Sequence, residues 1–234
     1  MKDVNFYDKE SGTYSDKRYP KIVSSYNQFF FTERLRIVLK MLDKNISEKK
    51  NLSLLEIGCA DGIVIEKIYE NFRNVFSSIA GIDISPEMIR VALEKYSGKP
   101  FTFKIRSDFS DALPKDVVVE IGVINYADIS SEFRFAYDYM KTDSIYIISL
   151  AGTNSLWNRI KKGDKGFNNF LSYQEYEKEI RKNFDILLSS SVGLFIPLIW
   201  KLPALARIIQ PIETVFRPIL PNCFHEKIYL LKKK

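Results

Sequence analysis

Small residues beside an acidic residue form the pattern in this chain best suited to hold a charged ligand. The sequence LLEIGCADG at positions 54–62 has small residues at Gly58, Ala60 and Gly62, directly after an apolar run. Small side chains let the backbone approach a ligand closely, and a helix that begins after such a turn presents unpaired N–H donors. We therefore expect a ligand site where a buried strand ends and a helix begins.

The acidic residue Glu56 distinguishes this turn from a dinucleotide-binding turn. Dinucleotide turns follow the order G-x-G-x-x-G, whereas the small residues here alternate as G-x-A-x-G. A carboxylate is poorly placed beside a pyrophosphate because both are negative. It suits a ligand that carries an ammonium and a sulfonium group, so a nicotinamide-dependent reductase is the less favoured alternative.

Three further groups follow the ends of the next apolar runs. Asp83 ends the second run, where it can accept hydrogen bonds from both hydroxyls of a ribose at the crevice of a doubly wound sheet. Ser107, Asp108 and Phe109 follow the third run and offer a carboxylate and an aromatic face for an adenine. The fourth run leads into residues 122–128, which we expect at the mouth of the same crevice.

Seven short runs rich in β-branched residues predict the strands that position these groups. Most are continuously apolar, as expected for strands covered on both faces. Helical patterns alternate with them: Ile65, Ile68 and Phe72 share one helical face, and Ser85-Pro86 predicts a helix start. This alternation predicts an α/β fold with a doubly wound, largely parallel sheet. The runs are Ser53–Ile57, Ser78–Ile82, Phe101–Ile105, Val117–Ile121, Ser144–Leu150, Asp185–Ser191 and His225–Leu231.

Composition indicates one soluble globular domain. The chain has 234 residues, 46% hydrophobic and 27% charged, which suits a single buried core. Its two cysteines, Cys59 and Cys223, are too far apart in sequence to suggest a disulfide framework, and the N-terminus has no apolar signal segment. We therefore expect a cytoplasmic protein. The net charge of +6 admits a polyanionic partner without requiring one.

Together, the turn and the three strand ends resemble the class I S-adenosylmethionine-dependent methyltransferase family, in particular its small-molecule branch. The resemblance covers residues 50–155 well and the remainder in outline. It implies a Rossmann-like sheet of seven strands, mostly parallel with an antiparallel last strand. It also implies S-adenosylmethionine as the methyl donor and S-adenosylhomocysteine as the product.

The resemblance also implies a role for each part of the site. The first motif, with Glu56, holds the methionine moiety; Asp83 holds the ribose; Asp108 contacts the adenine. Where the family usually has glycine, this chain has Ala60, whose methyl we expect to be tolerated at a negative φ. The expected cofactor-binding residues are Tyr14, Glu56, Gly58, Cys59, Ala60, Gly62, Asp83, Ile84, Met88, Ser107, Asp108, Phe109, Ile121 and Gly122.

The same resemblance suggests how the single domain is divided. Residues 1–45 are expected to form a helical lid that brings Tyr14 over the cofactor, and residues 50–192 the cofactor-binding core. Residues 193–222 are apolar and basic and contain five prolines, so they should form short helices and turns that cover the substrate. Residues 223–234 are expected to supply the last strand.

Methyl transfer is an in-line displacement that needs orientation more than proton transfer, and orientation can supply ~7–11 kcal/mol of the barrier. Tyr126 and Asp128 are the candidate catalytic residues because they lie nearest the expected methyl group. The alternative for Asp128 is a helix cap, and the single histidine, His225, is better explained by a structural role. One histidine and two distant cysteines predict no metal site.

The acceptor is expected to be a small molecule, methylated at oxygen or nitrogen. After the fourth strand the chain reads INYA rather than Asn-Pro-Pro-Tyr, and it lacks a Pro-Cys nucleophile, so nucleic acid is not favoured. Residues 193–222 suit a lipid-like, polyketide-like or glycosylated acceptor. The alternatives for this segment are contact with a membrane surface through residues 193–217 and a plain hydrophobic cover. For the whole chain, an RNA methyltransferase and a non-catalytic S-adenosylmethionine-binding protein remain open, and the sequence predicts no oligomeric state.

Overall fold

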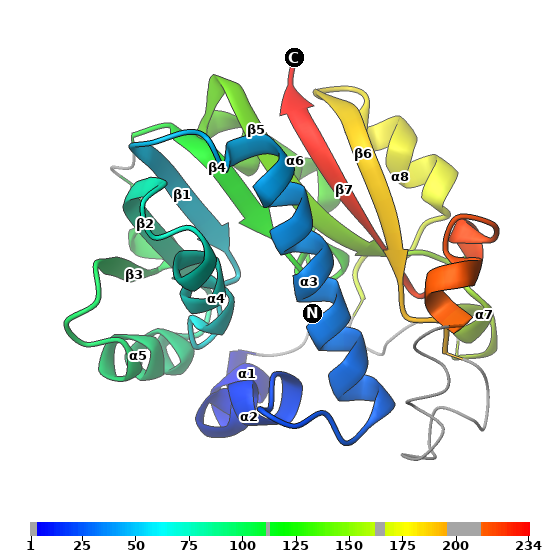
Figure 1. The fold of residues 1–234 in the computed structure, drawn as a ribbon, viewed down its shortest axis with the longest axis horizontal. Coiled ribbons are helices and arrows are strands. Elements are labelled where there is room, and N and C mark those ends of the chain that lie inside the picture. Colours follow the sequence, from blue (N-terminus) through cyan, green and yellow to red (C-terminus); the bar gives the residue numbers. More distant parts are fainter. Residues whose placement is uncertain (1–3, 111–112, 162–166, 196–211) are drawn as a thin grey trace.

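The computed structural model describes residues 4–110, 113–161, 167–195 and 212–234. Its centre is a seven-stranded sheet in the order β3-β2-β1-β4-β5-β7-β6 (Figure 1). Strands β1 to β5 are parallel, while β7 runs antiparallel to both β5 and β6. This confirms the expected sheet, including its antiparallel last strand. The strands are β1 (Leu52–Ile57), β2 (Phe76–Asp83), β3 (Phe101–Ile105), β4 (Lys115–Glu120), β5 (Met140–Ala151), β6 (Phe184–Val192) and β7 (Glu226–Lys233).

Helices cover both faces of the sheet because successive strand residues point to opposite sides. On β1, Leu54 belongs to the apolar cluster formed with α3 (Tyr26–Ile46), α4 (Ile63–Asn71) and α5 (Pro86–Lys95). The next residue, Leu55, belongs to the cluster formed with α6 and α8 on the other face. Helix α6 spans Ile129–Asp138, and α8 spans Tyr173–Ile180.

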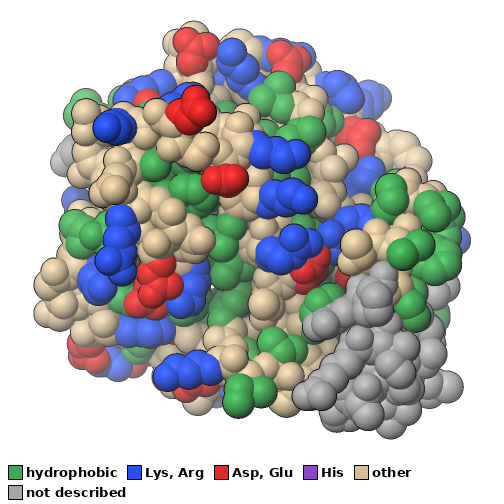
Figure 2. Space-filling model, viewed as in Figure 1, with side chains coloured by type: hydrophobic (Ala, Val, Ile, Leu, Met, Phe, Trp, Pro, Cys, Tyr) green, Lys and Arg blue, Asp and Glu red, His purple; other side chains and the backbone are tan. Residues whose placement is uncertain are grey.

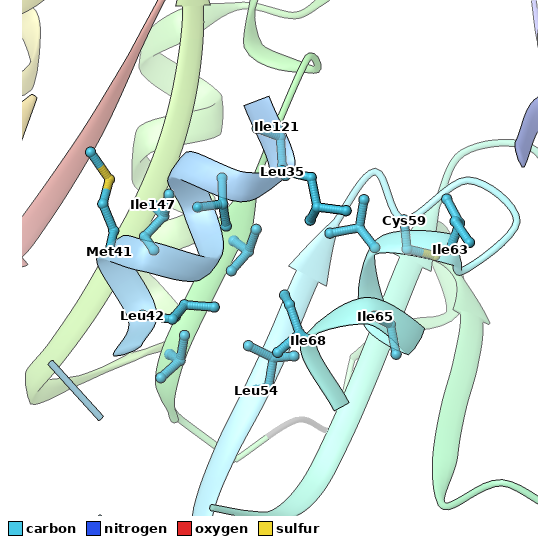
Figure 3. Packing of buried hydrophobic residues seen from close by; sticks show 14 of the residues in the cluster. Leu35, Met41, Leu42, Leu54, Cys59, Ile63, Ile65, Ile68, Ile121 and Ile147 are labelled. Carbon is cyan, nitrogen blue, oxygen red and sulfur yellow. The ribbon is translucent and has the colours of Figure 1, made fainter. Parts of the chain in front are cut away.

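The helix starts follow the local sequence signals. The Ser85 side chain accepts a hydrogen bond from the backbone N–H of Met88 and caps α5, with Pro86 at the first helical position, as predicted. Along α3, apolar residues recur at helical spacing and face the sheet. Figure 3 shows Leu35 and Leu42 of this helix among side chains from α4, β1 and β5.

The short helices α1 (Val4–Glu10) and α2 (Tyr14–Arg18) lie at the end of the sheet toward which the arrowheads of β1 and β4 point (Figure 1). Between β3 and β4, the described residues form the 3-10 turn η2 (Arg106–Asp108) rather than a longer helix. This leaves α1, α2 and α6 to surround the carboxyl ends of the parallel strands.

The predicted substrate cover falls only partly within the described residues. Of residues 193–222, the structure describes 193–195 and 212–222. The second range contains a helical turn at 212–216 and the start of η5 (Pro221–Cys223). The apolar residues expected to shape an acceptor pocket around Leu198 and Trp200 lie outside the described residues. Among the described helices, none is both long and apolar enough to cross a bilayer.

Candidate active site

A pocket opens at the carboxyl ends of β1, β2 and β4, as the strand-end residues predicted. Nine of the residues expected there line it: Tyr14, Gly58, Ala60, Asp83, Ile84, Met88, Ile121, Gly122 and Tyr126. Five others complete its wall: Tyr7, Arg106, Val123, Ala127 and Glu132. The sequence therefore predicted the position of the pocket and most of its lining, and it missed the contributions from α1, η2 and α6.

The turn after β1 is shaped by three residues with positive φ. Gly58 has φ +71°, and a Cβ at this position would lie 2.2 Å from Cγ2 of Val123, so only glycine fits. Ala60 has φ +47°, so the negative φ under which its methyl was expected to be tolerated is not present. For an L-residue the left-handed conformation costs roughly 1–2 kcal/mol. The Ala60 N–H donates to Oδ2 of Asp83 at 2.9 Å, which helps to hold this conformation.

Asp83 is fixed by the same turn. Besides the Ala60 N–H, it accepts the backbone N–H of Ser85 through Oδ1 at 2.9 Å. Burial raises the pKa of its carboxyl, and hydrogen bonds from the backbone of Ser85, Ala60 and Ile84 oppose that rise. Each carboxylate oxygen has a further lone pair. Asp83 can therefore accept hydrogen bonds from hydroxyl groups of a ligand in the pocket without giving up its protein partners.

Glu56 lies buried beneath the turn, and the pocket lining does not include it. One carboxylate oxygen, Oε2, has no hydrogen-bond partner in the described part of the chain, and the backbone N–H of Ile65 bonds to the carboxyl group. Burial, followed by the charges of Asp83 and Asp61, raises the pKa of Glu56 well above its usual value. Buried polar atoms without partners are rare in folded proteins. The site therefore favours a ligand with a positive charge.

Arg34 lies next to Gly122 of the pocket wall, and the sequence analysis missed it. It is buried on α3, and a Cβ added to Gly122 would lie 2.9 Å from its Nη1 atom. Nη1 pairs with Glu226 at 3.2 Å, Nη2 donates to the Tyr19 hydroxyl at 3.4 Å, and Nε has no partner among the described residues. Arg34 lies four residues after Phe30, so the sequence places both on one face of the helix, and this spacing was the available signal. An arginine buried on that face needs an anionic partner.

Aromatic side chains form one side of the pocket. Tyr126 contacts Tyr7 and Phe167 in edge-to-face geometry, with ring centroids 6.4 and 5.1 Å apart. The residue before it, Asn125, is buried and bonds to the Ala151 carbonyl and the Tyr176 hydroxyl. The turn that carries Tyr126 is thus anchored to β5 and α8, which fixes the ring at the pocket.

The remaining expected residues lie outside the pocket lining. Asp128 is exposed, and its side chain accepts the Ser131 N–H as the N-cap of α6, which fits its alternative role. Asp108 is also exposed and accepts a hydrogen bond from Ser107. The others are buried in packing positions: Cys59, Gly62 and Phe109.

His225 lies apart from the pocket lining, where its Nδ1 atom is 3.0 Å from Oδ1 of Asn158. The imidazole ring also contacts the rings of Phe30 and Phe195. These contacts fit the structural role expected for it. Within the described ranges, no three His, Cys, Asp or Glu residues come together as a metal site.

Comparison with known proteins agrees with this geometry. Residues 55–145 match a family model described as a methyltransferase domain. Among curated proteins, a malonyl-[acyl-carrier protein] O-methyltransferase of Bacillus cytotoxicus is 30% identical over 110 residues, covering 43% of this chain and 38% of the relative. That of Bacillus anthracis is 25% identical over 145 residues, covering 60% and 53%. The chain spans about half or less of the length of these relatives.

Solved structures share the fold along the whole chain. Magnesium protoporphyrin IX methyltransferase from Synechocystis PCC 6803 with bound SAH has a TM-score of 0.65 at 14% identity, covering 99% of this chain and 100% of that one. A [4+2]-cyclase has a TM-score of 0.64 at 16% identity, with 98% and 94% covered. Because one fold serves different reactions, the chemistry must be argued from the site.

Proposed function

We propose that this chain is a member of the class I S-adenosylmethionine-dependent methyltransferase family. In this proposal it transfers the methyl group of S-adenosylmethionine to an oxygen or nitrogen of a small acceptor molecule. The observation that carries the proposal is the acidic turn: Asp83 is fixed in the pocket wall, and Glu56 keeps a buried oxygen without a partner beneath it. These groups match a ligand that carries a ribose and an ammonium.

The residues present fit the ribose and the amino-acid end of this cofactor. Asp83 would accept from the ribose hydroxyls, as carboxylates at the ends of second strands do in nucleotide-binding sheets. Glu56 would balance the ammonium from below, and Arg34 would hold the carboxylate with the Nε donor that has no partner in the described structure. Gly58 and Gly122 leave room between these charged groups, because neither has a side chain.

The cofactor supplies a methyl group on a positively charged sulfur. The acceptor atom forms a bond to the methyl carbon while the carbon–sulfur bond breaks, and the sulfur keeps the electron pair. We infer that the chain contributes orientation and exclusion of water, with Tyr126 and its aromatic neighbours on one side of the acceptor. Among the described residues the pocket lining includes no histidine, and an acceptor that does not lose a proton needs no general base.

A carboxylate is such an acceptor, and it is the first class that we propose to test. The curated relatives are named for O-methylation of malonyl-[acyl-carrier protein], whose free carboxylate would gain a methyl ester. The net charge of +6 favours the approach of an anionic acceptor. Lipid-like and glycosylated metabolites with a hydroxyl or amine form the second class, and RNA the third.

The test is transfer of a labelled methyl group from S-adenosylmethionine to malonyl-carrier protein, to free malonyl thioester and to an extracted metabolite pool. We expect ester formation that disappears in Asp83→Ala, while Asp185→Ala, an exposed carboxylate on β6, serves as the control. Labelling of RNA instead of any small molecule would contradict the acceptor class. Tight binding of the cofactor with no acceptor labelled would indicate a non-catalytic binding protein.

A further inference from the structure

An ion pair between the turn after β3 and helix α6 lines the pocket. Nη1 of Arg106 donates to Oε2 of Glu132 at 2.8 Å, and both residues line the pocket. Arg106 follows β3 in the turn η2, while the buried Glu132 is on α6, so the pair joins the two elements. The guanidinium also lies over the ring of Phe135, 4.2 Å from its centroid, which fixes its plane.

A second carboxyl group lies beneath this pair. Glu120, at the end of β4, is fully buried; it accepts a hydrogen bond from the Tyr146 hydroxyl, and its Oε1 has no partner within the described structure. Burial, and then the negative charge of Glu132, raises the pKa of Glu120 well above its usual value. A protonated Glu120 can donate to Glu132. Glu132 is then a carboxylate held between a cation and a neutral acid.

The order of groups along the cofactor indicates which of them would lie against the Arg106–Glu132 pair. Given the proposed function, the amino-acid end lies near Glu56 on β1 and Arg34 on α3, and Asp83 at the end of β2 holds the ribose. Since β3 is the next strand beyond β2 in the sheet, the base attached to the ribose extends away from β1. The apolar Ile84 and Met88, which follow β2, line the pocket together with the ion pair.

We propose that the Arg106–Glu132 pair reads the edge of the adenine. The carboxylate of Glu132 accepts from the exocyclic amine, and an N–H of Arg106 donates to a ring nitrogen beside it. Charge-assisted hydrogen bonds of this kind are stronger and more selective than neutral ones. The inference rests on the proposed function, and it moves base recognition from the exposed Asp108 to a pair on η2 and α6.

The test compares S-adenosylhomocysteine with S-inosylhomocysteine, in which a carbonyl oxygen replaces the exocyclic amine and the ring nitrogen beside it carries hydrogen. We expect the wild-type protein to prefer the adenosyl ligand by about 10- to 100-fold in calorimetric titration, because a site built for one hydrogen-bonding pattern rejects its inverse. Glu132→Gln and Arg106→Gln should each reduce that preference to within about threefold, since a side-chain amide can both donate and accept and therefore pairs with either base.

One variant serves as the control. Asp108→Asn alters the exposed carboxylate beside the turn and should keep the wild-type preference. The ratio of two affinities on one variant is insensitive to a general loss of stability, and thermal unfolding verifies that each variant is folded. Full preference in both Glu132→Gln and Arg106→Gln, or its loss in Asp108→Asn, would overturn the inference and leave the proposed function intact. Binding of neither ligand by the wild type would overturn both.

Discussion

Three acidic side chains, Glu56, Asp61 and Asp83, surround the turn after β1. Burial raises the pKa of Glu56 most, and the negative charges of Asp83 and Asp61 raise it further. Ionising Glu56 in the folded protein without ligand is therefore unfavourable, so this group's contribution to stability is lost as pH rises through its raised pKa. A ligand ammonium reverses the preference by stabilising the carboxylate. The residue thus links cofactor binding to proton release.

For Glu56→Gln we expect weaker binding of S-adenosylhomocysteine and loss of the linked proton release. In the wild type, affinity should increase as pH rises through the raised pKa of Glu56, because the ammonium binds the ionised form. Calorimetric titration in two buffers of different ionisation enthalpy measures the released proton. Glu70→Gln, on the exposed side of α4, is the matched control and should release the same proton as the wild type. Equal proton release by Glu56→Gln and the wild type would be incompatible with this role.

A second prediction at this scale concerns Gly58. In Gly58→Ala the new methyl would collide with Val123 at a φ that disfavours L-residues, so we expect S-adenosylhomocysteine binding to be lost. Gly98→Ala is the control, since Gly98 has φ +81° but nothing within 4 Å of a new Cβ. It should cost about 1–2 kcal/mol of stability and leave affinity unchanged. Wild-type affinity in Gly58→Ala would contradict the close backbone approach that the site requires.

At the scale of elements, α1 and α2 are joined to the core by polar contacts beside the pocket. The Ser15 hydroxyl donates to Asp61, which also pairs with Lys95 at 3.0 Å, and the Ser85 hydroxyl donates to Asp8. Tyr7 and Tyr14 from the same segment line the pocket. A small number of exchangeable hydrogen bonds is consistent with the proposal that this segment acts as a lid that opens to admit a ligand.

We therefore expect Ser15→Ala to release S-adenosylhomocysteine about 2- to 10-fold faster, because a hydrogen bond of this kind contributes roughly 0.5–1.5 kcal/mol. The association rate should change less, since it reflects the open form. Stopped-flow displacement of the bound ligand measures both rates. Ser24→Ala is the control, because Ser24 follows α2 and its hydroxyl donates to Gln28. This variant should behave as the wild type. Unchanged release in Ser15→Ala would argue against closure by α1 and α2.

At the scale of the whole molecule, basic side chains are distributed widely. Figure 2 shows Lys and Arg spread over the face that carries α3, with Asp and Glu among them. The exposed positions of α3 include Arg36, Lys40 and Lys44, spaced four apart along one side of the helix. This distribution agrees with a general attraction for anions and does not by itself identify a nucleic-acid surface.

The sequence predicted the sheet because most strands contain a continuous apolar run, and it predicted the pocket because parallel strands end at a common edge. It could not predict Arg34, Arg106 or Glu132, whose roles depend on which distant elements pack together. The placement of Asp108 in the site rested on its position after the third strand and on the resemblance. In the structure the turn η2 directs Arg106 rather than Asp108 into the pocket wall.

The most direct test of the account is calorimetric titration of S-adenosylhomocysteine into the wild-type protein and into Asp83→Ala. The account predicts micromolar binding by the wild type and a loss of at least about tenfold in the variant, because removing one charge-assisted hydrogen bond costs about 1.5–3 kcal/mol. Absence of binding by the wild type, or equal affinities of the two proteins, would contradict the assignment of this pocket to S-adenosylmethionine.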